Sequence, residues 1–82
     1  MKETVGEVFG ERMREIRQKA GMTQVELAER SGLAQTRVSE LERGVRSPNL
    51  ATVVRLALAL DCKVSALVAG FDRRDLASIL SE

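Results

Sequence analysis

Two helix boundaries lie close together at Gly21 and Thr23, and they limit the kind of fold that this chain can form. Gly21 follows an amphipathic run, where glycine adopts the left-handed backbone of a helix C-terminus at least cost. Thr23 is followed three residues later by Glu26, the capping-box pattern that satisfies backbone amides at a helix start. We therefore predict short helices joined by tight turns. The first helix would bury a stripe with spacings of four, three and four: Phe9, Met13, Ile16 and Ala20.

The second and third helices are predicted to be separated by a four-residue turn. The helix that begins after Thr23 ends near residue 30, and Gly32 is free to adopt a positive φ in the turn that follows. The third helix is predicted over residues 35–43, where Val38 and Leu41 are the only large apolar side chains. Because this helix buries only a narrow strip, core packing alone does not explain it, and its polar surface is a candidate binding surface.

The C-terminal half is predicted to hold a strongly apolar fourth helix. Gly44 ends the third helix, and Asn49 is the expected cap of a helix over residues 50–60 that is apolar nearly all round. Such a helix must be covered on more than one side. After a break at residues 61–63, a further turn of helix is expected near Val64.

These patterns predict an all-α fold, a bundle of about five short helices that contains a helix-turn-helix. The 82 residues suffice for one modest core, so we expect a single domain over residues 1–71. Residues 72–82 have apolar residues at helical spacing and are predicted to form a tail or an extra short helix, which could also take part in a dimer interface.

Composition argues against catalysis and against a membrane or secreted location. There is no histidine and only one cysteine, Cys62, so we expect no metal site, no cofactor and no enzyme activity. No apolar run approaches the length of a membrane span, about 20 residues, and the N-terminus lacks a secretion signal. We therefore expect a cytoplasmic protein. The net charge of +1 means that any basic surface must come from local arrangement.

The segment from Thr23 to Gly44, TQVELAERSGLAQTRVSELERG, closely resembles the helix-turn-helix of lambda-repressor-like DNA-binding domains, the Cro/cI or XRE family. The resemblance extends from about Phe9 to Val68 and includes the Ser-Pro-Asn-Leu sequence that leads into the fourth helix. It implies that the third helix enters the major groove of double-stranded DNA. It also implies a transcriptional regulator, most simply a repressor, that is associated with the nucleoid.

The resemblance assigns base contacts to Gln35, Thr36 and Glu40 near the exposed side of the third helix. Glutamine can pair with adenine, threonine can contact thymine, and glutamate can accept from the cytosine amino group. Arg37 suits either a guanine or a phosphate, and the sequence leaves both roles open.

Other positions are assigned to the DNA backbone or to the scaffold. The resemblance implies two roles for the Gln24 side chain: it contacts a phosphate, and it braces Gln35. Further backbone contacts are implied just after the third helix, and a structural ion pair is implied between the first and third helices. The backbone residues are Arg43, Gly44 and Arg46, and the ion pair is Arg17 with Glu42.

Two residues depart from the family pattern. Ala34 lies where relatives often have serine or threonine as the cap of the third helix, and alanine there costs about 0.5–2 kcal/mol. Asp61 lies where glycine is usual, and aspartate tolerates a left-handed backbone better than most residues.

A homodimer is expected, because one recognition helix makes too few contacts for a specific site. The predicted interface is an exposed apolar patch in the C-terminal half that would match an inverted-repeat operator. Its residues are Val54, Leu58, Leu67, Val68 and Phe71.

Three narrower hypotheses remain open from the sequence. The length resembles that of restriction-modification controller proteins and of antitoxins, and an antitoxin would bind a toxin through residues 72–82. A protein-interaction module that has lost DNA binding is the alternative from another class. Binding to selected and random DNA over a range of salt concentrations would separate this alternative from the others.

Overall fold

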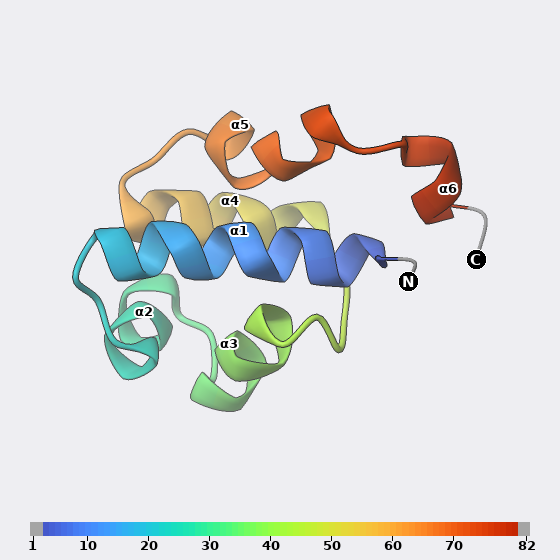
Figure 1. Ribbon diagram of the computed structural model, residues 1–82. Helices are drawn as coiled ribbons and strands as arrows, with labels where there is room; N and C mark the ends of the chain where they lie inside the picture. The colour runs from blue at the N-terminus through green and yellow to red at the C-terminus, as the bar shows by residue number, and fades with distance from the viewer. Residues whose placement is uncertain (1–2, 81–82) are drawn as a thin grey trace.

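The helix boundaries follow the capping signals of the sequence. The computed structural model describes residues 3–80, which contain helices only, so the predicted all-α class is confirmed for this part of the chain. Residues 1, 2, 81 and 82, which fall within the predicted domain and tail, lie outside the described residues. Figure 1 shows the elements in order: α1 (Val5–Lys19), α2 (Gln24–Ser31), α3 (Gln35–Glu42), α4 (Leu50–Leu60), α5 (Val64–Leu67), the 3-10 helix η1 (Ala69–Arg73) and α6 (Leu76–Leu80).

Helix α1 begins one turn before the apolar stripe identified in the sequence. Thr4 caps it: the threonine hydroxyl accepts from the Glu7 amide at 3.1 Å, and the Glu7 carboxylate accepts from the Thr4 amide at 2.9 Å. The predicted capping box of α2 has the same form, and the backbone hydrogen bond from Thr23 lowers the pKa of Glu26. Both helices thus start at a threonine with a glutamate three residues later.

The ends of the helices also lie where the sequence places them. Gly21 and Gly32 adopt positive φ angles of 71° and 74° after α1 and α2. Asn49 caps α4, its side chain accepting from the Thr52 amide at 2.8 Å. Asp61 follows α4 with a φ of 52°, which confirms that aspartate adopts a left-handed backbone here.

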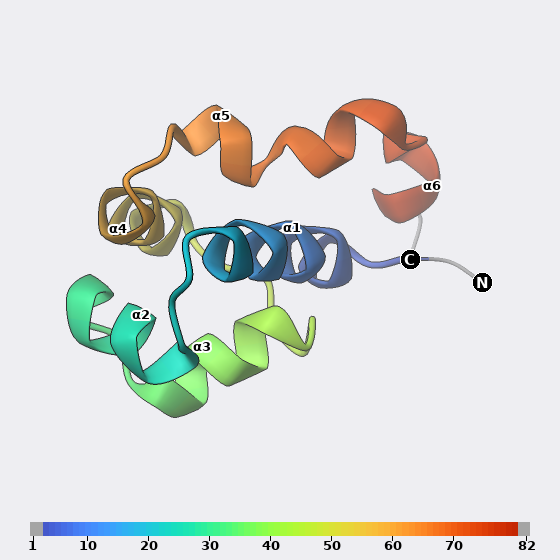
Figure 2. The same ribbon diagram turned by 60° about the vertical axis from the view of Figure 1, so that its left-hand side comes forward.

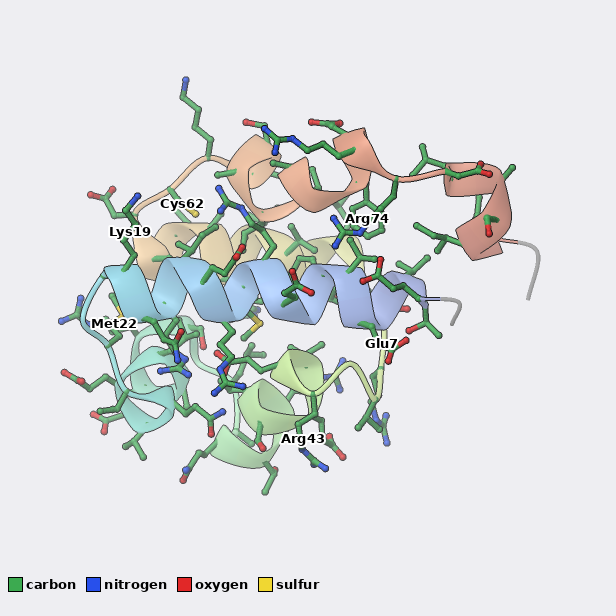
Figure 3. The ribbon with its side chains drawn as sticks, viewed as in Figure 1. Glu7, Lys19, Met22, Arg43, Cys62 and Arg74 are labelled. Carbon is green, nitrogen blue, oxygen red and sulfur yellow. The ribbon has the colours of Figure 1, made fainter. Side chains whose placement is uncertain are left out.

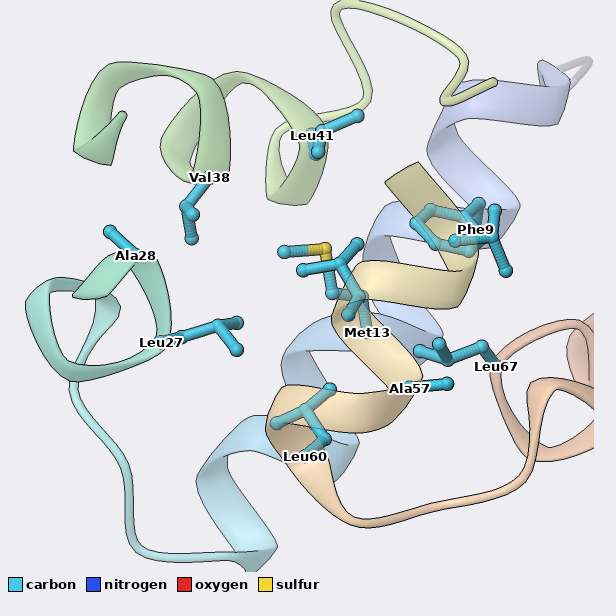
Figure 4. Close-up of a cluster of buried hydrophobic side chains, with 11 residues drawn as sticks. Phe9, Met13, Leu27, Ala28, Val38, Leu41, Ala57, Leu60 and Leu67 are labelled. Carbon is cyan, nitrogen blue, oxygen red and sulfur yellow. The ribbon is translucent and has the colours of Figure 1, made fainter. Parts of the chain in front are cut away.

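Helix α1 is the central element of the molecule. Figure 2 shows α1 between α2 and α3 on one side and α5 and η1 on the other, with α4 along one edge. Side chains from α1 to α5 meet in one core, much of which is drawn in Figure 4. The buried cluster consists of Phe9, Met13, Leu27, Ala28, Val38, Leu41, Val53, Leu56, Ala57, Leu60 and Leu67.

The prediction that Leu67 belongs to an exposed dimer patch is wrong, because Leu67 is part of this core. Its side chain is 0% exposed, whereas the next residue, Val68, is 38% exposed. Phe71 is half-buried and packs against the core. Since α5 is a single turn, only one of its apolar faces can point toward α1 and α4, and Leu67 occupies that face.

The tail folds back on α1. The Arg74 guanidinium lies 2.7 Å from a Glu3 carboxylate oxygen and 3.8 Å from a Glu11 carboxylate oxygen, and it donates to the Gly70 carbonyl oxygen. Ile79 of α6 is buried. Residues 72–80 therefore include the extra short helix that the sequence allowed, and Arg74 and Ile79 connect this segment with the rest of the protein.

Helix α3 begins without a side-chain cap, as its sequence predicts. Ala34 has the extended backbone of a cap residue but no side chain that can accept from an amide. Ala34→Thr should therefore raise the free energy of unfolding by about 0.5–2 kcal/mol relative to Ala34→Val, because the two differ by the capping hydroxyl. Urea unfolding of both variants measures the difference. Equal midpoints and slopes would show that the end of α3 gains nothing from a cap.

Candidate nucleic-acid interface

A shallow hollow of about 340 Å³ lies between α2 and α3 on the polar side of the helix-turn-helix. Val38 and Leu41 anchor the opposite side of α3 in the core, so its outer side chains are held at fixed positions. Five residues with predicted DNA contacts meet around this hollow, together with Ser39, for which no DNA contact is predicted from the sequence. The lining residues are Gln24, Gln35, Thr36, Ser39, Glu40 and Arg43.

The lining offers hydrogen-bonding groups of several kinds. Gln35, Thr36 and Arg43 are exposed, and Figure 3 shows Arg43 projecting from α3 away from the other helices. Glutamine amides and hydroxyl groups both donate and accept, arginine donates, and a carboxylate accepts. The exposed side of α3 therefore carries the chemistry needed to distinguish base edges in a major groove.

A buried ion pair holds α1, α2 and α3 together beneath this surface. The Glu42 carboxylate accepts two hydrogen bonds from the Arg17 guanidinium, at 2.5 and 2.9 Å, and these bonds raise the pKa of Arg17. Arg17 also donates to the Met22 carbonyl oxygen at 2.8 Å. Leaving one member of such a pair buried without its partner costs about 3–5 kcal/mol. The pair predicted from the sequence is thus placed as a scaffold contact.

Gln24 extends this network toward the surface. Its side-chain amide donates to Glu42 Oε1 at 3.1 Å, so Glu42 links Gln24 to Arg17. Family resemblance implies that Gln24 braces Gln35, and both side chains line the same hollow. In the structure, however, the Gln24 side chain donates its hydrogen bond to Glu42 and not to Gln35.

The remaining predicted contacts lie around the hollow and not in its lining. Arg37 is half-buried, and its Nε atom is buried without a hydrogen-bond partner. Arg46 is exposed in the loop after α3, with Nε 3.8 Å from Glu40 Oε1. Gly44 has a φ of 75° and packs against Glu7, which Figure 3 shows beside this loop.

Opposite charges alternate across the surface. Glu40 lines the hollow together with Arg43 and lies 3.8 Å from Arg46 Nε, so a carboxylate is placed among the cationic groups of this surface. A surface of this kind gains less from non-specific attraction to phosphates and depends more on matched contacts with bases.

The described residues show no arrangement for metal binding or for a membrane span. Among residues 3–80, no group of three or more His, Cys, Asp and Glu side chains is placed to hold a metal ion. No helix in this part of the chain has the length and apolar character to cross a bilayer. Cys62 is half-buried against the core, and burial raises the pKa of its thiol.

Comparison with known proteins identifies the same segment as a family domain. A helix-turn-helix family model (HTH_3) matches residues 13–67. The immunity repressor protein of Bacillus phage phi105 is 39% identical over 59 residues, which cover 72% of this chain and 41% of that protein. The control protein C.SmaI of Serratia marcescens is 36% identical over 64 residues, covering 78% of this chain and 76% of that protein.

A solved structure shows the same fold at similar length. The restriction-modification controller protein C.AhdI from Aeromonas hydrophila is 40% identical with a TM-score of 0.74, over 76% of this chain and 94% of that chain. By contrast, the chain spans less than half of the length of some relatives, the phage repressor among them. The resemblance stated from the sequence is confirmed, and the chain belongs to the helix-turn-helix family of the phage repressors and the restriction-modification controller proteins.

Proposed function

We propose that this protein is a sequence-specific DNA-binding transcriptional regulator, a repressor that binds an inverted-repeat operator as a homodimer. The observation that carries the proposal is the meeting of Gln24, Gln35, Thr36, Glu40 and Arg43 around one hollow on the exposed side of α3. Support also comes from the similar proteins, which include one named as an immunity repressor, one named as a control protein and one named as a restriction-modification controller protein.

In this proposal α3 lies in the major groove with the start of the helix toward the bases. Gln35, Thr36 and Glu40 contact base edges, and each good contact is worth about 1–3 kcal/mol of discrimination. Gln24, Arg43, Gly44 and Arg46 contact the sugar-phosphate backbone and set the register of the helix. Arg37 approaches the DNA from the flank of α3, and its guanidinium serves a base or a phosphate there.

The proposed dimer forms through the exposed side of α4. Leu50, Val54 and Leu58 recur every four residues and are 73%, 42% and 79% exposed, so they form one uncovered apolar stripe. Val68, which follows α5, and the partly buried Phe71 extend the proposed dimer surface. Leu67 is not part of this surface, because its side chain is buried in the core. A two-fold axis through this stripe would place two recognition helices about 34 Å apart, one helical turn of DNA.

Two narrower roles follow from separate observations. Similarity to nearly the full length of C.AhdI favours a small regulator of the controller type. The antitoxin alternative depends on the tail, where Leu76 and Leu80 are exposed and lie outside the matched family domain. Isolation of the protein from its own cells with a neighbour-encoded toxin would favour the antitoxin. We place the protein in the cytoplasm, associated with the nucleoid, and assign it no cofactor and no catalytic role.

The proposal is tested by selecting bound sequences from a random pool of double-stranded DNA. We expect an inverted repeat, with an affinity for the selected site that exceeds the affinity for random DNA about a thousandfold or more at physiological salt. Affinity for random DNA should fall steeply as salt increases. Recovery of no preferred sequence, with weak binding throughout, would favour the protein-interaction module instead.

A further inference from the structure

We propose that Gly10, supported by Gly6, is a positioning residue for DNA recognition, because it sets how closely the C-terminal end of α3 approaches α1. This inference rests on the proposed function and adds a specificity-determining position outside the DNA-binding surface. Both glycines lie within α1, where glycine costs about 1 kcal/mol relative to alanine in a helix interior. Their presence in a helix that is otherwise well capped calls for a compensating contact.

The compensating contact is a close backbone approach. A Cβ atom placed on Gly10 would lie 2.3 Å from the Leu41 carbonyl oxygen and 2.8 Å from the Glu42 carbonyl oxygen. A Cβ atom on Gly6 would lie 2.9 Å from the carbonyl oxygens of Gly44 and Arg46. The last turn of α3 and the loop after it are therefore held against α1 at a separation that only glycine permits.

The same end of α3 is also fixed through side chains. The Arg17 guanidinium of α1 binds the Glu42 carboxylate, and the Gly10 contact involves the Glu42 carbonyl oxygen. Helix α1 thus contacts Glu42 at two points, its carboxylate and its carbonyl oxygen. At the other end, α3 follows Ala34, which provides no side-chain cap.

A small displacement at this contact would shift the side chains of α3 that are proposed to contact the bases. With alanine at position 10, the Leu41 carbonyl would have to retreat by about 1 Å to restore an ordinary contact distance. Helix α3 has only eight residues, so a shift of its last turn would also displace the side chains of the preceding turn. Hydrogen bonds to bases require donor-acceptor distances of about 2.7–3.2 Å, so a shift of about 1 Å breaks at least one of them.

The test compares Gly10→Ala with Val8→Ala at a temperature well below both unfolding midpoints, with folding checked by circular dichroism. Val8 lies in the same helix and is buried, and it faces Gly70 of the C-terminal segment, so its truncation destabilises the protein away from α3. We expect Gly10→Ala to lower affinity for the selected site about tenfold or more, the equivalent of one base contact, and to lower affinity for random DNA by a smaller factor, because attraction to phosphates depends less on exact distances than base contacts do. Val8→Ala should keep both affinities.

Two results would overturn the inference. One is a folded Gly10→Ala protein whose selected-site affinity equals that of Val8→Ala. The other is an equal loss of affinity on selected and random DNA, which would indicate general damage and not mispositioning. If Gly10→Ala does not fold, Gly6→Ala, which would displace the loop after α3 by a smaller distance, takes its place, and a selected-site affinity equal to that of Val8→Ala would then overturn the inference. Failure of the wild-type protein to select any sequence would instead contradict the proposed function.

Discussion

Leu58→Glu is expected to turn the dimer into folded monomers and to lower affinity for the selected operator by about thirtyfold to several thousandfold. Leu58 is 79% exposed, so the substitution removes no core contact and should leave the monomer stable. In the proposed dimer, however, two glutamates would lie buried without partners near the two-fold axis, and such buried charges are strongly unfavourable.

The size of this effect follows from the loss of one recognition helix. Specific binding exceeds non-specific binding by about 4–10 kcal/mol for a typical regulator. If each half-site supplies half of that difference, a monomer loses about 2–5 kcal/mol, which gives the range of fold-changes above. Analytical ultracentrifugation measures the dissociation, and a binding titration on the selected operator measures the loss of affinity.

Leu80→Glu is the matched control, because Leu80 is also highly exposed but lies on α6, at the opposite end of the molecule from the C-terminal end of α4 (Figure 1 and Figure 2). It should leave the dimer intact. Dissociation by Leu80→Glu and not by Leu58→Glu would place the interface on the tail and contradict the assignment to α4.

The helix boundaries were predictable because they depend on local chemistry. The capping residues Thr23 and Asn49 act within one turn of their own positions, and each is followed by the amide that it accepts from. The cap at Thr4 carries the same signal, with Glu7 three residues later. The apolar stripe alone does not reveal this cap, because α1 begins one turn before the first residue of the stripe.

The faces of short segments were harder to predict. A stripe over three turns fixes which side of a helix is buried, and α4 shows it, with Val54 and Leu58 on the exposed side. Helix α5 has four residues, too few for a period to be established. The sequence therefore could not decide whether Leu67 or Val68 faces inward, and Leu67 was assigned to the wrong side.

In the candidate site too, positions along one helix were predictable from the sequence, whereas the packing of two helices was not. Gln35 and Glu40, predicted from the family spacing, line the same hollow beside α3, and helical spacing also indicates Ser39, which lies four residues after Gln35. The close approach at Gly10 depends on how α1 and α3 pack. No spacing within the sequence reports that separation, although two glycines inside a helix are themselves a signal.

The account depends most on the polar side of α3 recognising DNA bases, and one pair of variants tests this directly. Gln35→Ala combined with Glu40→Ala removes two base contacts, worth about 2–6 kcal/mol together, and should lower affinity for the selected operator about thirtyfold to about twenty-thousandfold. Affinity for random DNA should change little, because the residues that contact the backbone remain.

The control replaces the same residue types elsewhere, with Gln18→Ala and Glu29→Ala on exposed positions of α1 and α2. Both proteins are titrated on the selected operator and on random DNA at the same salt concentration. The account predicts that the α3 variant alone loses its preference for the operator. An α3 variant that binds the operator as tightly and as selectively as the control would contradict it.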